Sequence, residues 1–258
     1  MDSGTSLLGP GDPPPVDLHR PRGSSPFLLA CDHAGRLVPQ SLGRLGLAES
    51  EFERHIAWDI GASAVARRVS EALDATLVEQ RYSRLVIDCN RPPQVPNSVP
   101  AISEATPIPG NEGLTEPDRE RRIREVFRPY HERLAAEIDR RAEAGQETVL
   151  IALHSFTPVY LGESRPWHVG TLYGRDARLA GPLRRVLAGE AGLVVGDNEP
   201  YAVSDETDCT IPLHGERRGL VHVGIEIRQD LVGDAAGQAE WADRLARSLP
   251  RALGEARP

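Results

Sequence analysis

Short, almost purely apolar runs alternate along the chain with longer segments of helical periodicity. The runs contain few polar positions, which is typical of strands that are buried on both faces of a sheet. By this pattern the sequence predicts strands at 27–31, 76–80, 84–88, 148–154, 167–174, 192–196 and 220–227.

The segments between several of these strands repeat apolar residues at helical spacing. In 59–74 the apolar side chains fall on one face, and Asp59 is predicted to be the N-cap. The segment 117–144 carries a single apolar stripe among charged residues, and Pro129 is expected to bend this helix. Further helices are predicted at 176–191 and 236–253.

Interleaved strands and helices predict an α/β fold, with a sheet between two layers of helices. Residues 1–23 are rich in Pro, Gly and Ser without periodicity, so a flexible arm is expected there. Residues 24–258 show no repeat and no dividing linker, which favours a single domain. Two irregular stretches within it, 92–118 and 198–219, are candidate lids over a site.

Composition excludes several classes of function. The 258 residues include no lysine, so Schiff-base catalysis, a P-loop lysine and a Ser–Lys dyad are impossible. The formal net charge of −8 argues against a nucleic-acid partner. No apolar run approaches the roughly 18 residues of a membrane span, and the first residues do not resemble a secretory signal, so no membrane partner is expected. The odd number of cysteines, 3, favours a reducing compartment, and a cytoplasmic location is expected.

Ionisable residues stand at or near the ends of three expected strands. Asp32 and His33 follow the first strand, His154 ends the fourth, and Glu226 lies near the end of the last. If these strands are parallel neighbours, the side chains meet in one crevice at the carboxyl edge of the sheet. Two imidazoles and a carboxylate form a zinc site, beside which a second carboxylate can act as general base. The alternatives are structural histidines and a Glu226–Arg228 salt bridge.

A second polar cluster is RYSRLVIDCNR, at 81–91. Arg84 begins the expected strand 84–88, and Asn90 and Arg91 follow it directly. An amide and a guanidinium at this place are suited to hold a substrate carboxylate. The alternative is a set of ion pairs at the edge of the sheet.

Six segments, in chain order, resemble the N-formylglutamate amidohydrolase family: CDHAG, RYSRLVIDCNRPP, LHSFTP, HVGTLYG, DNEPYA and GIEIRQDL. The resemblance extends over most of residues 25–250. It implies a zinc-carboxypeptidase-like fold, a twisted mixed sheet sandwiched by helices. It also implies a metal-dependent hydrolase that converts N-formyl-L-glutamate into formate and glutamate.

The resemblance further implies a metal site for Zn²⁺ or another divalent ion. His33 and His154 match histidines of the family, although the usual Pro-His-Ser-Gly reads Asp-His-Ala-Gly here. Where zinc carboxypeptidases have a glutamate ligand, this chain has Arg36. The third ligand is expected to be Asp59, with Asp32 as the alternative.

Glu226 stands where carboxypeptidase-like enzymes keep their general base. Asn90 and Arg91 resemble the pair that binds the substrate carboxylate in that fold. The remaining candidates for contact with a small anionic N-acyl amino acid are Arg84, His168, His214 and Arg228.

Other functions remain open to the same sequence. The zinc machinery could act on a different N-acyl amino acid or small peptide, or the fold could serve as a non-catalytic binding module. A thiol hydrolase based on Cys31 is disfavoured, because a cysteine within a strand is expected to pack as a small hydrophobe. Cys209, in a polar stretch, is expected to be an exposed thiol, with a metal contact as the alternative.

Overall fold

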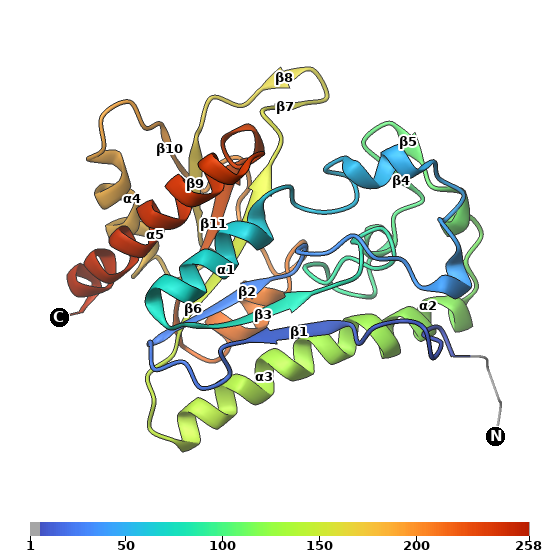
Figure 1. The fold of residues 1–258 in the computed structure, drawn as a ribbon, viewed down its shortest axis with the longest axis horizontal. Coiled ribbons are helices and arrows are strands. Elements are labelled where there is room, and N and C mark those ends of the chain that lie inside the picture. The colour runs from blue at the N-terminus through green and yellow to red at the C-terminus, as the bar shows by residue number, and fades with distance from the viewer. Residues whose placement is uncertain (1–5, 258) are drawn as a thin grey trace.

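The computed structural model describes residues 6–257, in which a seven-stranded sheet separates two layers of helices (Figure 1). The strand order is β1–β3–β2–β6–β11–β9–β10. Strands β3, β2, β6 and β11 are parallel, whereas β1 is antiparallel to β3, and β9 is antiparallel to β11. The strands are β1 (Val16–His19), β2 (Phe27–Cys31), β3 (Thr76–Gln80), β6 (Val149–Phe156), β9 (Val169–Leu172), β10 (Val195–Asp197) and β11 (Val221–Arg228).

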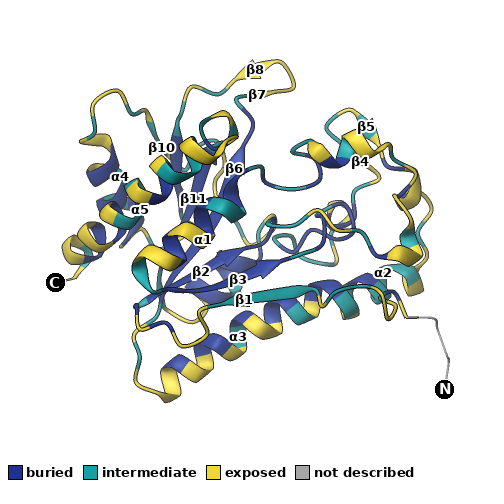
Figure 2. Ribbon diagram, in the orientation of Figure 1, coloured by how far each residue is buried: buried dark blue, intermediate teal, exposed yellow. Residues whose placement is uncertain are grey.

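Each face of the sheet is covered by its own helices. One layer contains α1 (Ala62–Leu73), α4 (Ala180–Ala188) and α5 (Ala235–Ala256); the other contains α2 (Glu116–Arg122) and α3 (Arg128–Glu143). Alternate side chains of β2 enter the two cores, since Phe27, Leu29 and Cys31 pack with the α1 layer and Leu28 and Ala30 with the α3 layer. In Figure 2 the central strands β2, β3 and β6 are accordingly buried, the edge strand β1 is intermediate, and the helices are buried on their inner sides. The expected three-layer α/β sandwich with a mixed sheet is confirmed.

Two small hairpins stand apart from the main sheet. They are β4 (Ile102–Ser103) with β5 (Thr106–Pro107), and β7 (Val159–Tyr160) with β8 (Glu163–Ser164). Within residues 6–257, no helix combines the length and the apolar character that crossing a membrane requires.

The structure differs from the predicted elements in four places, of which the first three concern a strand, the N-terminal segment and a helix cap. The segment 84–88 is not a strand; its apolar residues are buried in the α3-layer core from a series of turns. Strand β1 lies within 1–23, where no regular structure was expected, and it pairs with β3. The N-cap of α1 is Gly61, in the left-handed region with φ +79°, and not Asp59. A short apolar run indicates burial, but it does not fix the backbone conformation in which the side chains are buried.

The long helix predicted at 117–144 is interrupted in the structure. A π-helical turn at Ile123–Phe127 separates α2 from α3. Pro129 therefore falls in the first turn of α3, where its missing N–H costs little.

Arg141 is a fully buried side chain that ties α3 to the sheet. Its guanidinium donates to the carbonyls of Ser25, Pro26 and Phe27, to the Thr76 hydroxyl and to Glu137, at 3.0–3.4 Å. We expect Arg141→Leu to lower the free energy of unfolding by about 3–5 kcal/mol, because these buried acceptors lose their donor. Equilibrium unfolding in urea measures the change.

Arg140→Leu is the matched control for this substitution. Arg140 also pairs with Glu137, but its side chain is solvent-exposed, so a loss below about 1 kcal/mol is expected. Equal losses for the two variants would show that the buried bonds of Arg141 add nothing.

Candidate active site

The carboxyl ends of three adjacent parallel strands bring the predicted side chains together. His154 lies in β6, Glu226 is its register neighbour in β11, and His33 follows β2 on the other side of β6. Asp59 reaches the same point from the loop before α1. The backbone N–H of Asp59 donates to the His33 carbonyl oxygen at 3.0 Å. The loop at His33 also needs Gly35, because a Cβ there would lie 1.9 Å from the Arg81 carbonyl oxygen.

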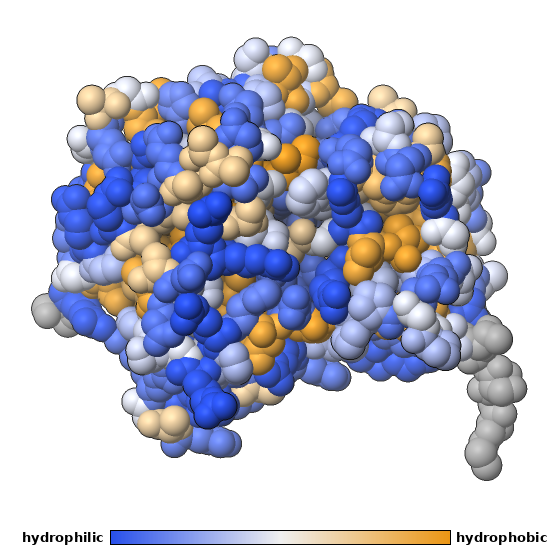
Figure 3. Space-filling model, viewed as in Figure 1, coloured by the Kyte–Doolittle hydropathy of each residue, from blue (hydrophilic) through white to orange (hydrophobic). Residues whose placement is uncertain are grey.

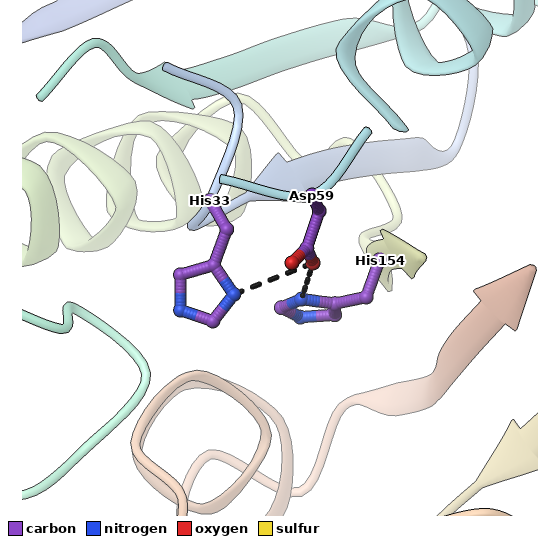
Figure 4. Close-up of side chains that lie close together, drawn as sticks. All are labelled: His33, Asp59 and His154. Carbon is purple, nitrogen blue, oxygen red and sulfur yellow. Dashed lines mark hydrogen bonds and ion pairs between the residues drawn. The ribbon is translucent and has the colours of Figure 1, made fainter. Parts of the chain in front are cut away.

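Three buried side chains converge in this crevice (Figure 4). One carboxylate oxygen of Asp59, Oδ2, lies 3.3 Å from Nδ1 of His33 and 3.0 Å from Nδ1 of His154. One potential ligand atom from each residue lies within 4.8 Å of the other two. Two imidazole nitrogens and a carboxylate oxygen at this spacing are the donor set of a catalytic zinc site.

The second nitrogen of each histidine also faces a carboxylate. His33 Nε2 lies 2.7 Å from Oδ1 of Asp88, and His154 Nε2 lies 3.2 Å from Oδ2 of Asp32, the latter outside hydrogen-bond geometry. Metal-binding histidines typically donate their other N–H to such a group, which fixes the tautomer. Asp32 thus lies on the outer side of His154, and Asp59 is the carboxylate placed with the two inner nitrogens.

The charges of the site also fit a bound cation. Four buried carboxylates surround it, those of Asp32, Asp59, Asp88 and Glu226, and burial of unpaired carboxylates is costly. Burial opposes protonation of the His154 ring, yet Asp32 and Asp59 together raise its pKa well above the ordinary value. The crevice therefore favours positive charge, and the described residues fit a divalent ion.

Glu226 has the surroundings expected of a general base. Its side chain is buried, and Oε2 has no hydrogen-bond partner in the described part of the chain. Burial raises the pKa of Glu226 to about 7; the charge of His154 opposes this rise and that of Asp59 adds to it. A carboxylate with a pKa near neutrality can both accept and return a proton.

A cavity of about 620 Å³ opens beside these groups. Its floor is the sheet face that carries His154 and Glu226. The preceding residue on this face is small in both strands: Ala152 in β6 and Gly224 in β11. Helix α3 covers the same face at the other half of the sheet, where it packs against β1 and β3. Small residues and the absence of a covering α3 at this part of the sheet leave room for a ligand.

Three predicted substrate-binding residues line this cavity, namely Arg84, Asn90 and Arg91. Their side chains are already engaged. Arg84 pairs with Asp88 at 2.8 Å and with Asp59 at 3.3 Å, so it holds two carboxylates of the site in place. The other two contact the loop that follows β10: the Asn90 amide oxygen accepts from the N–H groups of Cys209 and Thr210, and Arg91 donates to the Thr207 carbonyl.

The other three, His168, His214 and Arg228, lie outside the cavity, and the expectation that they line it is wrong. His168 accepts a hydrogen bond from the Val194 N–H, and Arg228 turns away to pair with Asp230 at 2.7 Å. His214 is buried against His131, with their ring nitrogens 3.0 Å apart. His168 precedes β9, Arg228 is the last residue of β11 and His214 lies in a π-helical turn, so nearness to a strand end did not fix where these side chains point.

The cysteines have no catalytic surroundings. Cys31 packs in the α1-layer core, and burial raises the pKa of its thiol well above the usual value, so it is unsuited to be a nucleophile. Cys209 is buried in the α3-layer core and is not the exposed thiol expected from its polar neighbours.

Comparisons with known proteins agree with the resemblance. The family described as N-formylglutamate amidohydrolase matches residues 25–233. A curated N-formylglutamate deformylase of Pseudomonas putida is 30% identical over 198 residues, 66% of this chain and 69% of that protein.

Two solved structures share the fold. A gene product of Agrobacterium tumefaciens has 41% identity and a TM-score of 0.93 over 96% of this chain and 98% of its own. An N-formylglutamate amidohydrolase of Ralstonia eutropha JMP134, with 19% identity, has a TM-score of 0.61 over 92% of this chain and 98% of its own.

Proposed function

The chain belongs to the N-formylglutamate amidohydrolase family, and from this premise we propose that it is a metal-dependent amidohydrolase that converts N-formyl-L-glutamate into formate and glutamate. One observation carries the metal-dependent part of the proposal. Potential ligand atoms of three residues, His33, Asp59 and His154, lie close together beside a cavity. The catalytic candidate Glu226 lines the same cavity.

The proposed metal is Zn²⁺, held by Nδ1 of His33, Nδ1 of His154 and a carboxylate oxygen of Asp59. When bound, a divalent ion at this site would activate water and polarise the formyl carbonyl. Asp88 and Arg84 support the ligands: Asp88 orients His33, and Arg84 fixes Asp59.

The proton transfers are assigned to Glu226. It takes a proton from the attacking water as the new C–O bond forms at the formyl carbon. It then gives this proton to the amide nitrogen as the C–N bond breaks, so that formate and glutamate leave. Asn90 and Arg91, at the cavity wall, are proposed to face a carboxylate of this small anionic substrate.

The proposal includes a cytoplasmic location. Cys31, Cys89 and Cys209 are all buried free thiols, which suits a protein of a reducing compartment.

The proposal predicts hydrolysis of N-formyl-L-glutamate that depends on metal. Removal of metal with a chelator should lower turnover more than 100-fold, and addition of Zn²⁺ should restore it, because activation of water depends on the cation. The measurement is release of formate by metal-free and zinc-reconstituted protein.

A substrate panel separates this function from its alternatives. N-acetyl-L-glutamate, N-formyl-L-methionine and a dipeptide are compared with N-formyl-L-glutamate on the zinc-loaded protein. Faster turnover of another compound would assign a different amide substrate. Metal binding without turnover of any compound would favour the non-catalytic binding module.

A further inference from the structure

The side chain of Arg165 lies behind the wall of the cavity, between two tyrosines that line it. Its guanidinium carbon lies 4.6 Å from the ring centroid of Tyr160 and 4.9 Å from that of Tyr201. Both tyrosines line the cavity and are partly exposed, so they stand at its mouth. Tyr160 belongs to the β7–β8 hairpin, which carries an apolar patch at the top of Figure 3, and Tyr201 belongs to the loop after β10. Stacking from two separate segments fixes the guanidinium plane.

The hydrogen bonds of Arg165 leave one edge of the guanidinium free. Nη1 donates to the Tyr201 hydroxyl oxygen at 2.9 Å and to the Thr157 hydroxyl at 3.3 Å. Among residues 6–257, Nε and Nη2 have no hydrogen-bond partner, and no carboxylate lies within 4 Å of the side chain. Arg84 and Arg91, by contrast, both lie within 4 Å of Asp88. The Nε–Nη2 edge is the one that binds a carboxylate through two parallel hydrogen bonds.

Tyr201 connects this arginine to the catalytic candidate. Burial raises the pKa of the Tyr201 hydroxyl; the negative charge of Glu226 raises it further, and the positive charge of Arg165 opposes the rise. Both charged groups are therefore within electrostatic range of the same phenol. Because the phenol oxygen accepts from Arg165, its O–H remains able to donate to a ligand.

We propose that Arg165 is a specificity-determining residue that binds the side-chain carboxylate of a dicarboxylic N-acyl amino acid. This inference rests on the proposed function and names the part of the substrate that the cavity mouth selects. The substrate has two carboxylates, and Asn90 with Arg91 is proposed for one of them. A guanidinium already oriented by two rings loses little freedom when it binds the other.

The test compares N-formyl-L-glutamate with its neutral isostere N-formyl-L-glutamine. Arg165→Met keeps a long side chain but removes the charge and the donors. The value of kcat/KM for N-formyl-L-glutamate should fall about 10–100-fold, mainly through KM, whereas that for N-formyl-L-glutamine should change less than about 3-fold. Arg165→Lys keeps the charge without the paired donors and should lie between wild type and Arg165→Met.

Arg244→Met is the matched control. Arg244 also lies over an aromatic ring, 4.5 Å from the centroid of Trp241, but it belongs to α5, and Trp241, unlike Tyr160 and Tyr201, does not line the cavity. Both substrates should be turned over by this variant as by wild type. Thermal unfolding of every variant reports whether the fold is intact.

Binding of glutarate and butyrate, measured by calorimetry, gives a readout that does not require turnover. Arg165→Met should weaken glutarate at least 10-fold more than butyrate. The inference would be overturned if Arg165→Met kept the wild-type preference for N-formyl-L-glutamate over N-formyl-L-glutamine. It would also be overturned if the variant lost equally for both compounds of each pair. Arg165 would then serve only to hold the hairpin and the loop together. Absence of turnover by wild type would instead overturn the proposed function, and the glutarate comparison would still decide the role of Arg165.

Discussion

Replacing Glu226 with glutamine is expected to lower kcat about 10²–10⁴-fold while the affinity for the proposed metal and the fold are unchanged. The amide is similar in shape to the carboxylate but cannot accept a proton from water or return it to the leaving nitrogen. KM should change little, because Glu226 acts on the reacting atoms and its Oε2 has no bond to the protein that would be lost. Steady-state kinetics on the zinc-loaded variant, together with metal content, measure the effect.

Glu216→Gln is the control for removal of a buried glutamate charge. Glu216 is a poorly exposed side chain that pairs with Arg175 and does not line the cavity. Its substitution should leave kcat unchanged. If Glu226→Gln retained kcat within 3-fold of wild type, Glu226 would have no part in proton transfer and another base would have to be found.

Substitution of the proposed metal ligands is expected to produce a graded loss of zinc affinity. Asp59→Asn should weaken binding more than 100-fold, because Asp59 is the carboxylate that lies beside both inner nitrogens. Asp88→Asn, which affects the group behind His33, should weaken it about 10–100-fold. Competition with a chromophoric chelator gives both affinities.

The free energy of unfolding gives a second measure of zinc binding by the same variants. Zinc at 100 times its dissociation constant should add about 2.7 kcal/mol to wild type, and this gain should be lost in Asp59→Asn. His168→Gln is the control, because His168 lies outside the cavity and should change neither affinity nor stabilisation. Equal affinity for wild type and Asp59→Asn would remove Asp59 from the ligand set and leave the alternative, Asp32, to be tested.

The sequence could predict that His33 and His154 lie close together, because the same apolar runs predict the strands and the position of the polar residues at their ends. Apolar runs that end in His or in Asp-His indicate both a buried strand and a polar group at its carboxyl edge, so His33 and His154 could be placed together before their distance was known. Asp88 ends a similar apolar run, although that run forms turns and not a strand. Its position behind His33 was not predicted, because no spacing in the sequence links Asp88 to His33, 55 residues earlier.

The cavity mouth was far less predictable, because it is made by loops. Arg165 and Tyr201 are 36 residues apart, and no periodicity links them; only the packing of a hairpin on a loop brings them into contact. The predictions for His168 and Arg228 failed because their side chains follow local partners: His168, just before β9, accepts from the Val194 N–H, and Arg228, the last residue of β11, pairs with Asp230.

The position of β11 has a consequence for synthesis of the protein. Among the described strands β11 is the last in the chain, yet it lies between β6 and β9. Until 221–228 have left the ribosome, β6 presents an unpaired edge, and the β9–β10 pair cannot join the rest of the sheet. A nascent chain therefore exposes unpaired strand edges until β11 has been synthesised. Chaperones that bind such edges should bind stalled chains shorter than about 220 residues.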